Sequence, residues 1–297
     1  MIPISVVIPA RNRSATLPNC LESVLSQTYP AAEVIVVDDH SSDDTAAVVQ
    51  AFAARGVRYV PASGHGAQAA RNQGVREAIS PWIAFQDSDD LWMLDKLQRQ
   101  VAALNAAGAS HDIVLHGDGL KRPAGGGPDE PLSVLLTEGY CFAELLHRPA
   151  PMFPTLLVSR RALERCDGLD EQCPSYQEWD TAIRLSRECR FVHIREPLFI
   201  WIWHDAPTIS KDLRRTVQGY NYVLDTWRDE ILRTHGVRYW RQQKLQCAFD
   251  AMRGDLWEDA LLHLRNAGMQ PTVQLTRALC HRHFAPRGVG RLLRLFA

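Results

Sequence analysis

The first 115 residues alternate short unbroken apolar runs with segments whose apolar side chains recur at helical spacing. An unbroken apolar run is typical of a strand that is buried on both faces. Five segments are expected to form strands: residues 4–8, 34–37, 57–60, 82–85 and 113–115. The helical segments between them supply the crossovers that parallel strands need. The pattern predicts an α/β fold with a doubly wound, mostly parallel sheet, in which ligands bind beyond the carboxyl ends of the strands.

The second half of the chain gives weaker signals. Residues 117–131 are rich in glycine and proline and predict a loop, while apolar runs at 155–159 and 199–203 predict two further strands. From about residue 211 the pattern is helical, and small residues between 248 and 267 predict a helical hairpin that resembles one tetratricopeptide-type unit. We therefore expect a domain over 1–210, with halves 1–115 and 116–210, followed by a helical C-terminal extension over 211–297.

Charge and composition exclude several classes of protein. Lys and Arg total 33 and Asp and Glu total 34, so the chain lacks the basic excess of a nucleic-acid-binding protein. No apolar run approaches the roughly 18 residues needed to span a bilayer, and residues 2–8 do not read as a signal peptide. The seven cysteines include no CxxC pair, so reduced thiols are expected rather than disulfides or a zinc knuckle. These observations predict a cytoplasmic protein.

Acidic residues follow two of the predicted strands directly. Asp38 and Asp39 follow the strand at 34–37, and Asp87 and Asp89 follow the strand at 82–85. Side chains two residues apart at a strand end point to the same side, and such a pair of carboxylates suits a hard divalent ion that also holds a diphosphate. The alternative is turn and cap chemistry, which also favours Asp and Ser.

Four motifs in this order give the chain a specific resemblance. They are SVVIPARN at 5–12, VVDDHSSDDT at 36–45, ARNQG at 70–74 and FQDSDD at 85–90. Together they resemble the inverting family 2 glycosyltransferases of the GT-A fold, over roughly residues 1–205. The resemblance implies transfer of a sugar from a nucleotide-diphosphate donor, with 1–115 as the nucleotide-binding half and 116–210 as the acceptor and catalytic-base half.

The resemblance also implies roles for residues in the nucleotide-binding half. Asp39 would accept a hydrogen bond from the imide N–H of uracil, with Asp38 beside it as a second contact or a structural cap. Pro9 and Arg11 would shape the base pocket, although Arg11 could equally be a surface cation. Arg71 would contact the base or the diphosphate, or it would pair with a nearby acid. Asp87 would face the ribose or the metal shell. Asp89 would bind a Mn or Mg ion that bridges to the diphosphate.

The second half should supply a base that takes the proton of the acceptor hydroxyl. Residues 176–184 read YQEWDTAIR, where the family often has Glu-Asp-Trp-Asp, so the base position carries Glu178. Asp180 is the competing base; its other expected role is an ion pair with Arg184 one helical turn later. His204 matches a position where some family members place a histidine near the metal, and a structural role is its alternative.

The resemblance suggests a probable UDP-sugar donor and a saccharide or lipid-linked saccharide acceptor, as in cell-surface polysaccharide synthesis. Two other functions compete with this one. A sugar nucleotidyltransferase of the same fold would need a glycine-rich loop after the first strand, yet no glycine precedes Gly56. A non-catalytic nucleotide-sugar-binding protein would be favoured by loss of Asp89 or of the acids at 176–180, and these are present.

The last segment of the chain, residues 271–297, is basic and contains no acidic residue, with leucine and phenylalanine between the arginines. Two interpretations remain open for it: peripheral contact with the anionic inner face of a membrane, or a helix docked on the core with a solvated arginine face. The sequence gives no sign of the oligomeric state.

Overall fold

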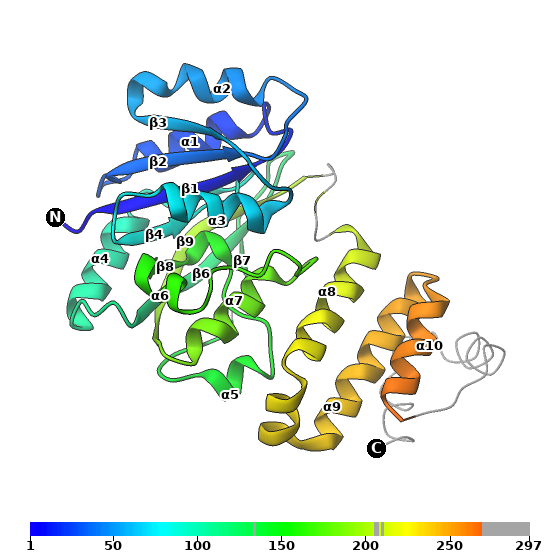
Figure 1. Ribbon diagram of the computed structural model, residues 1–297. Coiled ribbons are helices and arrows are strands. Elements are labelled where there is room, and N and C mark those ends of the chain that lie inside the picture. The colour runs from blue at the N-terminus through cyan, green and yellow to red at the C-terminus, as the bar shows by residue number, and fades with distance from the viewer. Residues whose placement is uncertain (133–134, 205–207, 209–210, 269–297) are drawn as a thin grey trace. The chain divides into compact units, whose positions relative to one another are not determined.

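The computed structural model describes residues 1–132, 135–204, 208 and 211–268 (Figure 1). The chain divides into two compact units, one made of residues 1–172 and 177–205 and the other of 173–176 and 206–297. The first unit is built on a sheet with strand order β3-β2-β1-β4-β8-β6-β9-β5, in which β7 pairs with β6. Its strands are β1 (Ile4–Ala10), β2 (Glu33–Asp38), β3 (Val57–Pro61), β4 (Trp82–Phe85), β5 (Leu91–Trp92), β6 (Ile113–Pro123), β7 (Glu130–Leu132), β8 (Leu157–Ser159) and β9 (Arg190–Trp203).

The N-terminal half of the sheet is parallel, as the strand–helix alternation predicts. Strands β1 to β4 pair only in parallel with one another, in the order β3-β2-β1-β4. Strand β8 then enters antiparallel between β4 and β6, and β6 pairs in parallel with β9. The predicted α/β class with a mostly parallel sheet is therefore confirmed, with one reversed strand inside the sheet and the short edge strands β5 and β7 also antiparallel.

Helices cover both faces of the parallel half of this sheet. Alternating residues of β1 show why: Val6 and Ile8 belong to the core cluster that holds the helices α1 (Leu17–Leu25), α2 (Thr45–Ala51) and α4 (Lys96–Ala106). Val7 points to the opposite face, where α3 (Ala67–Glu77) packs against β1 and β2. Because β1 is buried on both faces, all of its residues except Ser5 are apolar.

Close packing of α3 on the sheet depends on Gly74. A Cβ atom at this position would overlap Cγ1 of Val7 and lie 3.3 Å from Cγ2 of Val37. Both valines are buried strand residues with a stiff χ1, so neither can move aside at low cost. Gly74→Ala should therefore lower the free energy of unfolding by about 1–3 kcal/mol, as overpacked cores do.

Urea denaturation with Gly125→Ala as the control would check this prediction. A Cβ atom at Gly125 meets nothing within 4 Å, so that variant should unfold like the wild type. Equal destabilisation of both variants would mean that the fit of α3 on β1 is not what Gly74 provides.

The loop predicted over 117–131 is wrong in part, because β6 continues through Pro123 and β7 begins at Glu130. The glycines in this stretch serve close strand packing. A Cβ atom at Gly117 would lie 2.7 Å from the carbonyl oxygen of Ile194 in β9, and one at Gly119 would overlap the ring of Phe199. Glycine at these positions lets β9 pair with β6 along its whole length, with a bulge at Asp118.

Residues 142–186 add short helices around the second half of the sheet. They are α5 (Phe142–Leu145), the 3-10 turn η2 (Phe153–Thr155), α6 (Arg160–Arg165) and α7 (Gln177–Ser186). Ile183 and Leu185 on α7 are buried, as the helical pattern predicts. The side chain of Ser159 caps α6 by accepting a hydrogen bond from the amide of Ala162.

The second unit is mainly helical over its described residues from 211 onward, whereas residues 173–176 are not helical. It consists of α8 (Leu213–Thr226), α9 (Arg228–Arg253), which is interrupted by non-helical backbone at Gly236, and α10 (Trp257–Asn266). Small residues such as Ala248 and Ala260 are buried between α9 and α10, so the predicted helical hairpin is present. The basic segment 271–297 and the interpretations given for it lie outside the described residues.

Two further expectations concern the state of the cysteines and the hydropathy of the helices. Six of the seven cysteines lie among the described residues, and all six are free thiols. Within the same residues, none of the helices combines the length and the hydropathy that crossing a bilayer requires.

Candidate functional site

The acidic residues that follow β2 and β4 lie at the carboxyl edge of the parallel strands. Ala10 at the end of β1 pairs with Asp38 at the end of β2, and Val7 of the same strand pairs with Phe85 at the end of β4. The amide of Gln86 also donates to the carbonyl of Val7. Strand β1 thus brings the two acidic segments, which are far apart in sequence, to the same edge of the sheet.

Asp39 is buried, and its carboxylate is held by the loop that precedes α3. Oδ2 accepts a hydrogen bond of 3.0 Å from the amide of Gly66 and lies 3.7 Å from the guanidinium of Arg11. Oδ1 lies 3.2 Å from Nδ1 of His40. Arg11 is 63% exposed, so it is a mobile cation at the rim, whereas Pro9 is buried within β1. Asp39 is therefore a fixed hydrogen-bond acceptor close to the surface.

Asp38 has two donors within the protein. Oδ1 accepts from the amide of Ser41 at 3.1 Å, and Oδ2 accepts from the hydroxyl of Tyr59 at 2.8 Å. Partial burial and the hydrogen bond to Asp38 raise the pKa of Tyr59. These contacts give Asp38 the structural capping role that was the second of the two roles expected for it.

Arg71 and Asp87 form an ion pair of 2.6 Å beneath this edge. The Arg71 guanidinium is buried and lies 4.1 Å from the centre of the Phe153 ring; it also donates to Gln68 and, at 3.4 Å, to Gln177 on α7. Its Nε finds no acceptor in the described part of the chain. Burial raises the pKa of the Asp87 carboxyl, and Arg71 counteracts that rise. Of the two roles expected for Arg71, pairing with an acid is present.

A guanidinium and an imidazole from distant segments of the chain lie close to the Asp89 carboxylate. Nε2 of His204 lies 3.3 Å from Oδ2 of Asp89. Arg13 was not predicted, yet its guanidinium lies 3.2 Å from the same oxygen. The only sequence signal for Arg13 was its place in the loop after β1, at the functional edge of the sheet. Nδ1 of His204 is buried and has no partner among the described residues.

Helix α7 carries both candidate bases, and the two differ in burial and in ion pairing. Asp180 is fully buried and pairs with Arg184 at 2.6 Å; Arg184 also bonds to Asp170 at 3.0 Å. Glu178, in the first turn, is only half-buried. The ion pair that was expected of Asp180 as its non-catalytic role is thus present.

The pKa of Glu178 is raised above its ordinary value, mainly because burial disfavours the carboxylate. The negative charge of Asp87 raises it further, while a backbone hydrogen bond and the charge of Arg71 lower it. These interactions place Glu178 near the acidic edge formed by β4. A carboxyl group with a raised pKa in such a site is suited to general base catalysis near neutral pH.

Two details concern the strand β9. Trp203 ends this strand, is 39% exposed and packs against the ammonium group of Lys121. The neighbouring acid Asp90 is buried and accepts a hydrogen bond from the amide of Ile202, which ties the acidic loop to β9.

Comparison with known proteins finds a family profile and relatives for the first part of the chain. Residues 5–124 match the sequence profile described as "Glycosyl transferase family 2". A curated relative from Escherichia coli, "UDP-Glc:alpha-D-GlcNAc-diphosphoundecaprenol beta-1,3-glucosyltransferase WfgD", is 36% identical over 102 residues, which is 34% of this chain and 40% of the relative. The chain spans less than half the length of the first curated relatives that it matches.

Solved structures share the fold. S. aureus TarS 1-349 in complex with UDP-GlcNAc has a TM-score of 0.68 at 17% identity, covering 89% of this chain and 80% of that one. The mannosyltransferase PcManGT from Pyrobaculum calidifontis, in complex with GDP-Man and Mn2+, has a TM-score of 0.60 at 17% identity, covering 99% and 84%. The expected GT-A fold is thereby confirmed. Residues 5–124 thus match the sequence profile of glycosyl transferase family 2, within a fold that these solved structures share.

Proposed function

We propose that this protein is an inverting glycosyltransferase that moves a sugar from a UDP-sugar to a saccharide or lipid-linked saccharide. The observation that carries the proposal is the buried Arg71 guanidinium, which pairs with Asp87 at 2.6 Å and donates to Gln177, the residue before Glu178. It brings a half-buried candidate base to the edge of the sheet where nucleotide ligands bind in open α/β folds. The relative that acts with UDP-Glc and the fold neighbour bound to UDP-GlcNAc support the donor class.

In this proposal Asp39 accepts the imide N–H of uracil. Its carboxylate is already held by Gly66, so little orientational freedom is lost on binding. Arg11 and Pro9 flank the base, and Arg71 keeps Asp87 turned toward the ribose side of the site. Asp38 supports the turn after β2 through its two internal hydrogen bonds.

A divalent ion, Mn or Mg, fits the proposed position at Asp89. The Asp89 carboxylate is partly exposed, and Nε2 of His204 lies 3.3 Å from its Oδ2, so a carboxylate oxygen and an imidazole nitrogen lie together; the Arg13 guanidinium, 3.2 Å from the same oxygen, would have to move away from the ion. Asp89 and His204 would hold the ion, and when bound it would stabilise the charge of the leaving nucleoside diphosphate. The Mn2+ of the PcManGT complex supports the choice of a divalent metal.

Glu178 acts as the base in this proposal. It takes the proton of the acceptor hydroxyl while the hydroxyl oxygen attacks the anomeric carbon from the face opposite the nucleotide. Asp180 remains the alternative base, but its ion pair with Arg184 makes its lone pairs less available. The acceptor would approach from the 116–150 side, and the diphosphoundecaprenol-linked acceptor named for the E. coli relative supports a lipid-linked saccharide.

A thermal-shift panel of UDP-, GDP-, dTDP- and CDP-sugars, each with and without Mn2+, tests the donor. A ligand bound only by the folded state stabilises it by about 2.7 kcal/mol at a hundred times its dissociation constant. We expect the largest shift with UDP-sugars plus Mn2+. A larger shift with GDP-sugars would overturn the uridine assignment, and no shift with any donor would favour the alternative functions.

A further inference from the structure

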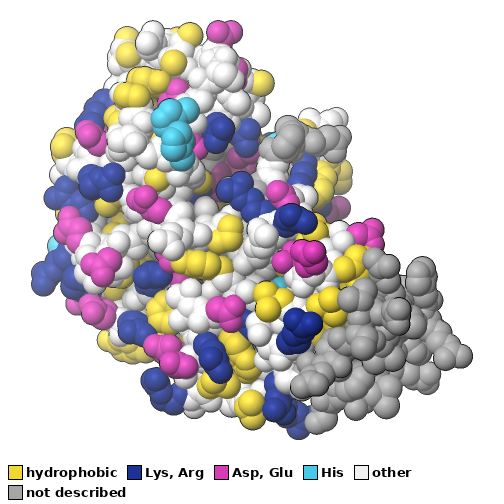
Figure 2. All heavy atoms as spheres, turned by 45° about the vertical axis from the view of Figure 1, so that its right-hand side comes forward, with side chains coloured by type: hydrophobic (Ala, Val, Ile, Leu, Met, Phe, Trp, Pro, Cys, Tyr) yellow, Lys and Arg dark blue, Asp and Glu magenta, His cyan; other side chains and the backbone are white. Residues whose placement is uncertain are grey.

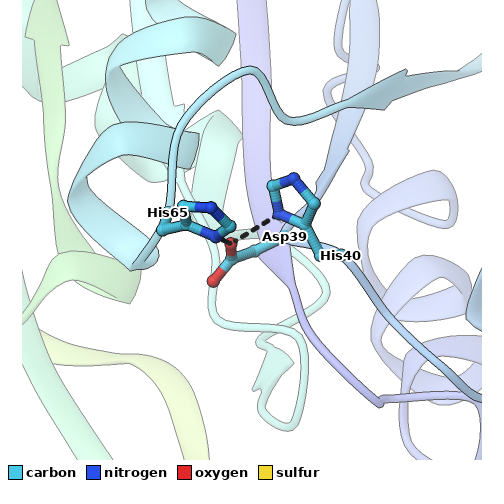
Figure 3. Close-up of side chains that lie close together, drawn as sticks. All are labelled: Asp39, His40 and His65. Carbon is cyan, nitrogen blue, oxygen red and sulfur yellow. Dashed lines mark hydrogen bonds and ion pairs between the residues drawn. The ribbon is translucent and has the colours of Figure 1, made fainter.

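Two histidines adjoin the carboxylate of Asp39 on its solvent side (Figure 3). Nδ1 of His40 lies 3.2 Å and Nδ1 of His65 4.0 Å from Oδ1 of Asp39. One ligand atom from each of the three side chains lies within 4.8 Å of the other two. Within the part of the chain that the structure describes, this is the one group of three or more His, Cys, Asp and Glu residues that meets this spacing. We call it the Asp39–His40–His65 cluster.

The local backbone directs these side chains toward one another. His40 has a positive φ of 58°, which is uncommon for a residue other than glycine. Its ring stacks on that of His65 with centroids 4.3 Å apart. Meanwhile the amide of Gly66 holds Oδ2 of Asp39, so Oδ1 is the oxygen that faces the rings. The cluster therefore combines one fixed carboxylate oxygen with two imidazoles.

The cluster is open to ions from solvent. The side chains of His40 and His65 are 47% and 80% exposed, and Figure 2 shows histidine side chains side by side on the molecular surface. The exposed Arg11 guanidinium lies near Oδ2 rather than between Oδ1 and the rings. An ion could thus reach Oδ1 without displacing a buried group.

The donor set and the spacing suit a borderline divalent ion. Two imidazoles and a carboxylate favour Zn²⁺ over Mg²⁺ or Mn²⁺, which prefer sites made of oxygen ligands. With metal–ligand bonds of about 2.0–2.1 Å, tetrahedral ligand atoms lie about 3.4 Å apart. The distances of 3.2 and 4.0 Å from Oδ1 bracket that value, so small rotations of exposed rings would complete the site.

We propose that the Asp39–His40–His65 cluster binds a borderline divalent ion such as Zn²⁺, and that this ion and the nucleobase exclude each other at Asp39. The ion takes the oxygen that faces solvent, and it places a positive charge where the imide N–H would donate. The exclusion rests on the proposed function, whereas ion binding does not. This site is separate from the Asp89–His204 pair, whose residues follow β4 and β9.

Ion binding is tested on the full chain with Zn²⁺ titration calorimetry and with the visible spectrum of Co²⁺ as a coordination signature. We expect His40→Ala and His65→Ala each to weaken Zn²⁺ binding by at least about tenfold and to remove the spectrum of tetrahedral Co²⁺. His235→Ala, on α9 in the other unit, should bind as the wild type does. If His40→Ala and His65→Ala bind Zn²⁺ as tightly as the wild type, the site is refuted.

Exclusion is tested with uridine, which has no phosphate to chelate the ion, by saturation-transfer NMR. We expect uridine signals from the metal-free wild type, loss of these signals on adding Zn²⁺, and no effect of Zn²⁺ in the His65→Ala variant. Signals that persist with Zn²⁺ bound would overturn exclusion. If uridine gives no signal without Zn²⁺ either, the proposed nucleobase site fails and the exclusion fails with it, while calorimetry still decides whether the ion site exists.

Discussion

Replacing Glu178 with Gln should leave donor binding intact and reduce sugar transfer by on the order of 10²-fold or more, the usual contribution of a general base. The amide keeps the shape of the side chain but cannot accept a proton. Because Glu178 is half-buried in the first turn of α7, the change should not disturb the fold. Transfer is measured with saturating donor, and binding is measured separately by calorimetry.

The pH profile provides an independent readout of the same residue. Transfer by the wild type should fall as the pH drops through the pKa of Glu178, because the protonated carboxyl cannot take the acceptor proton. Burial raises that pKa, so the midpoint should lie above the ordinary value for glutamate. The residual activity of Glu178→Gln should lack this acidic limb.

Asp180→Asn is the control for the base assignment. It removes the charge that pairs with Arg184 in the core, so we expect a lower melting temperature as its main effect. If Glu178→Gln transfers sugar at the wild-type rate while a folded Asp180→Asn is inactive, then Asp180 is the base.

Asp89→Ala should abolish the part of UDP affinity that depends on Mn²⁺, and Asp39→Ala should weaken UDP binding whether or not Mn²⁺ is present. A hydrogen bond to a charged group contributes about 1.5–3 kcal/mol, so the loss at Asp39 should be about tenfold or more. The two variants should differ in their dependence on Mn²⁺ because Asp89 pairs with His204 at the proposed metal position, whereas Asp39 lies at the end of β2.

Calorimetry with UDP in Mn²⁺ and in EDTA separates the two effects. Asp44→Ala removes one exposed negative charge from the segment between β2 and α2, and it should bind UDP like the wild type. Full UDP affinity in both the Asp89 and Asp39 variants would refute the assignment of the nucleotide and metal positions.

The parallel half of the fold could be predicted from the sequence because buried strands leave an unambiguous signal. Residues 34–37 and 82–85 are apolar without a break, and the acids that follow them had to lie at the carboxyl edge. The second half could not be predicted as well, because the glycines at 117 and 119 are typical both of loops and of close strand packing. Only the pairing of β6 with β9 distinguishes these two uses.

Motifs could name candidate residues of the site and the Asp180–Arg184 pair one helical turn apart, but they could not name the partners that come from distant loops. The contact of Arg13 with Asp89 joins the loop after β1 to the loop after β4, and no local pattern marks it. His65 lies beside Asp39 only because the amide of Gly66 binds that carboxylate and brings the start of α3 to β2. Such contacts depend on the tertiary path of loops, which periodicity does not encode.

The buried guanidinium of Arg71 joins parts of the protein that would serve different steps of the reaction. It bonds to Asp87 on the donor side and to Gln177, the residue before Glu178, and it stacks on Phe153. The separation between the leaving nucleotide and the base would then be set by one rigid planar group. A shift of that group would change both donor affinity and turnover, so one displacement would account for a loss of affinity and a loss of rate.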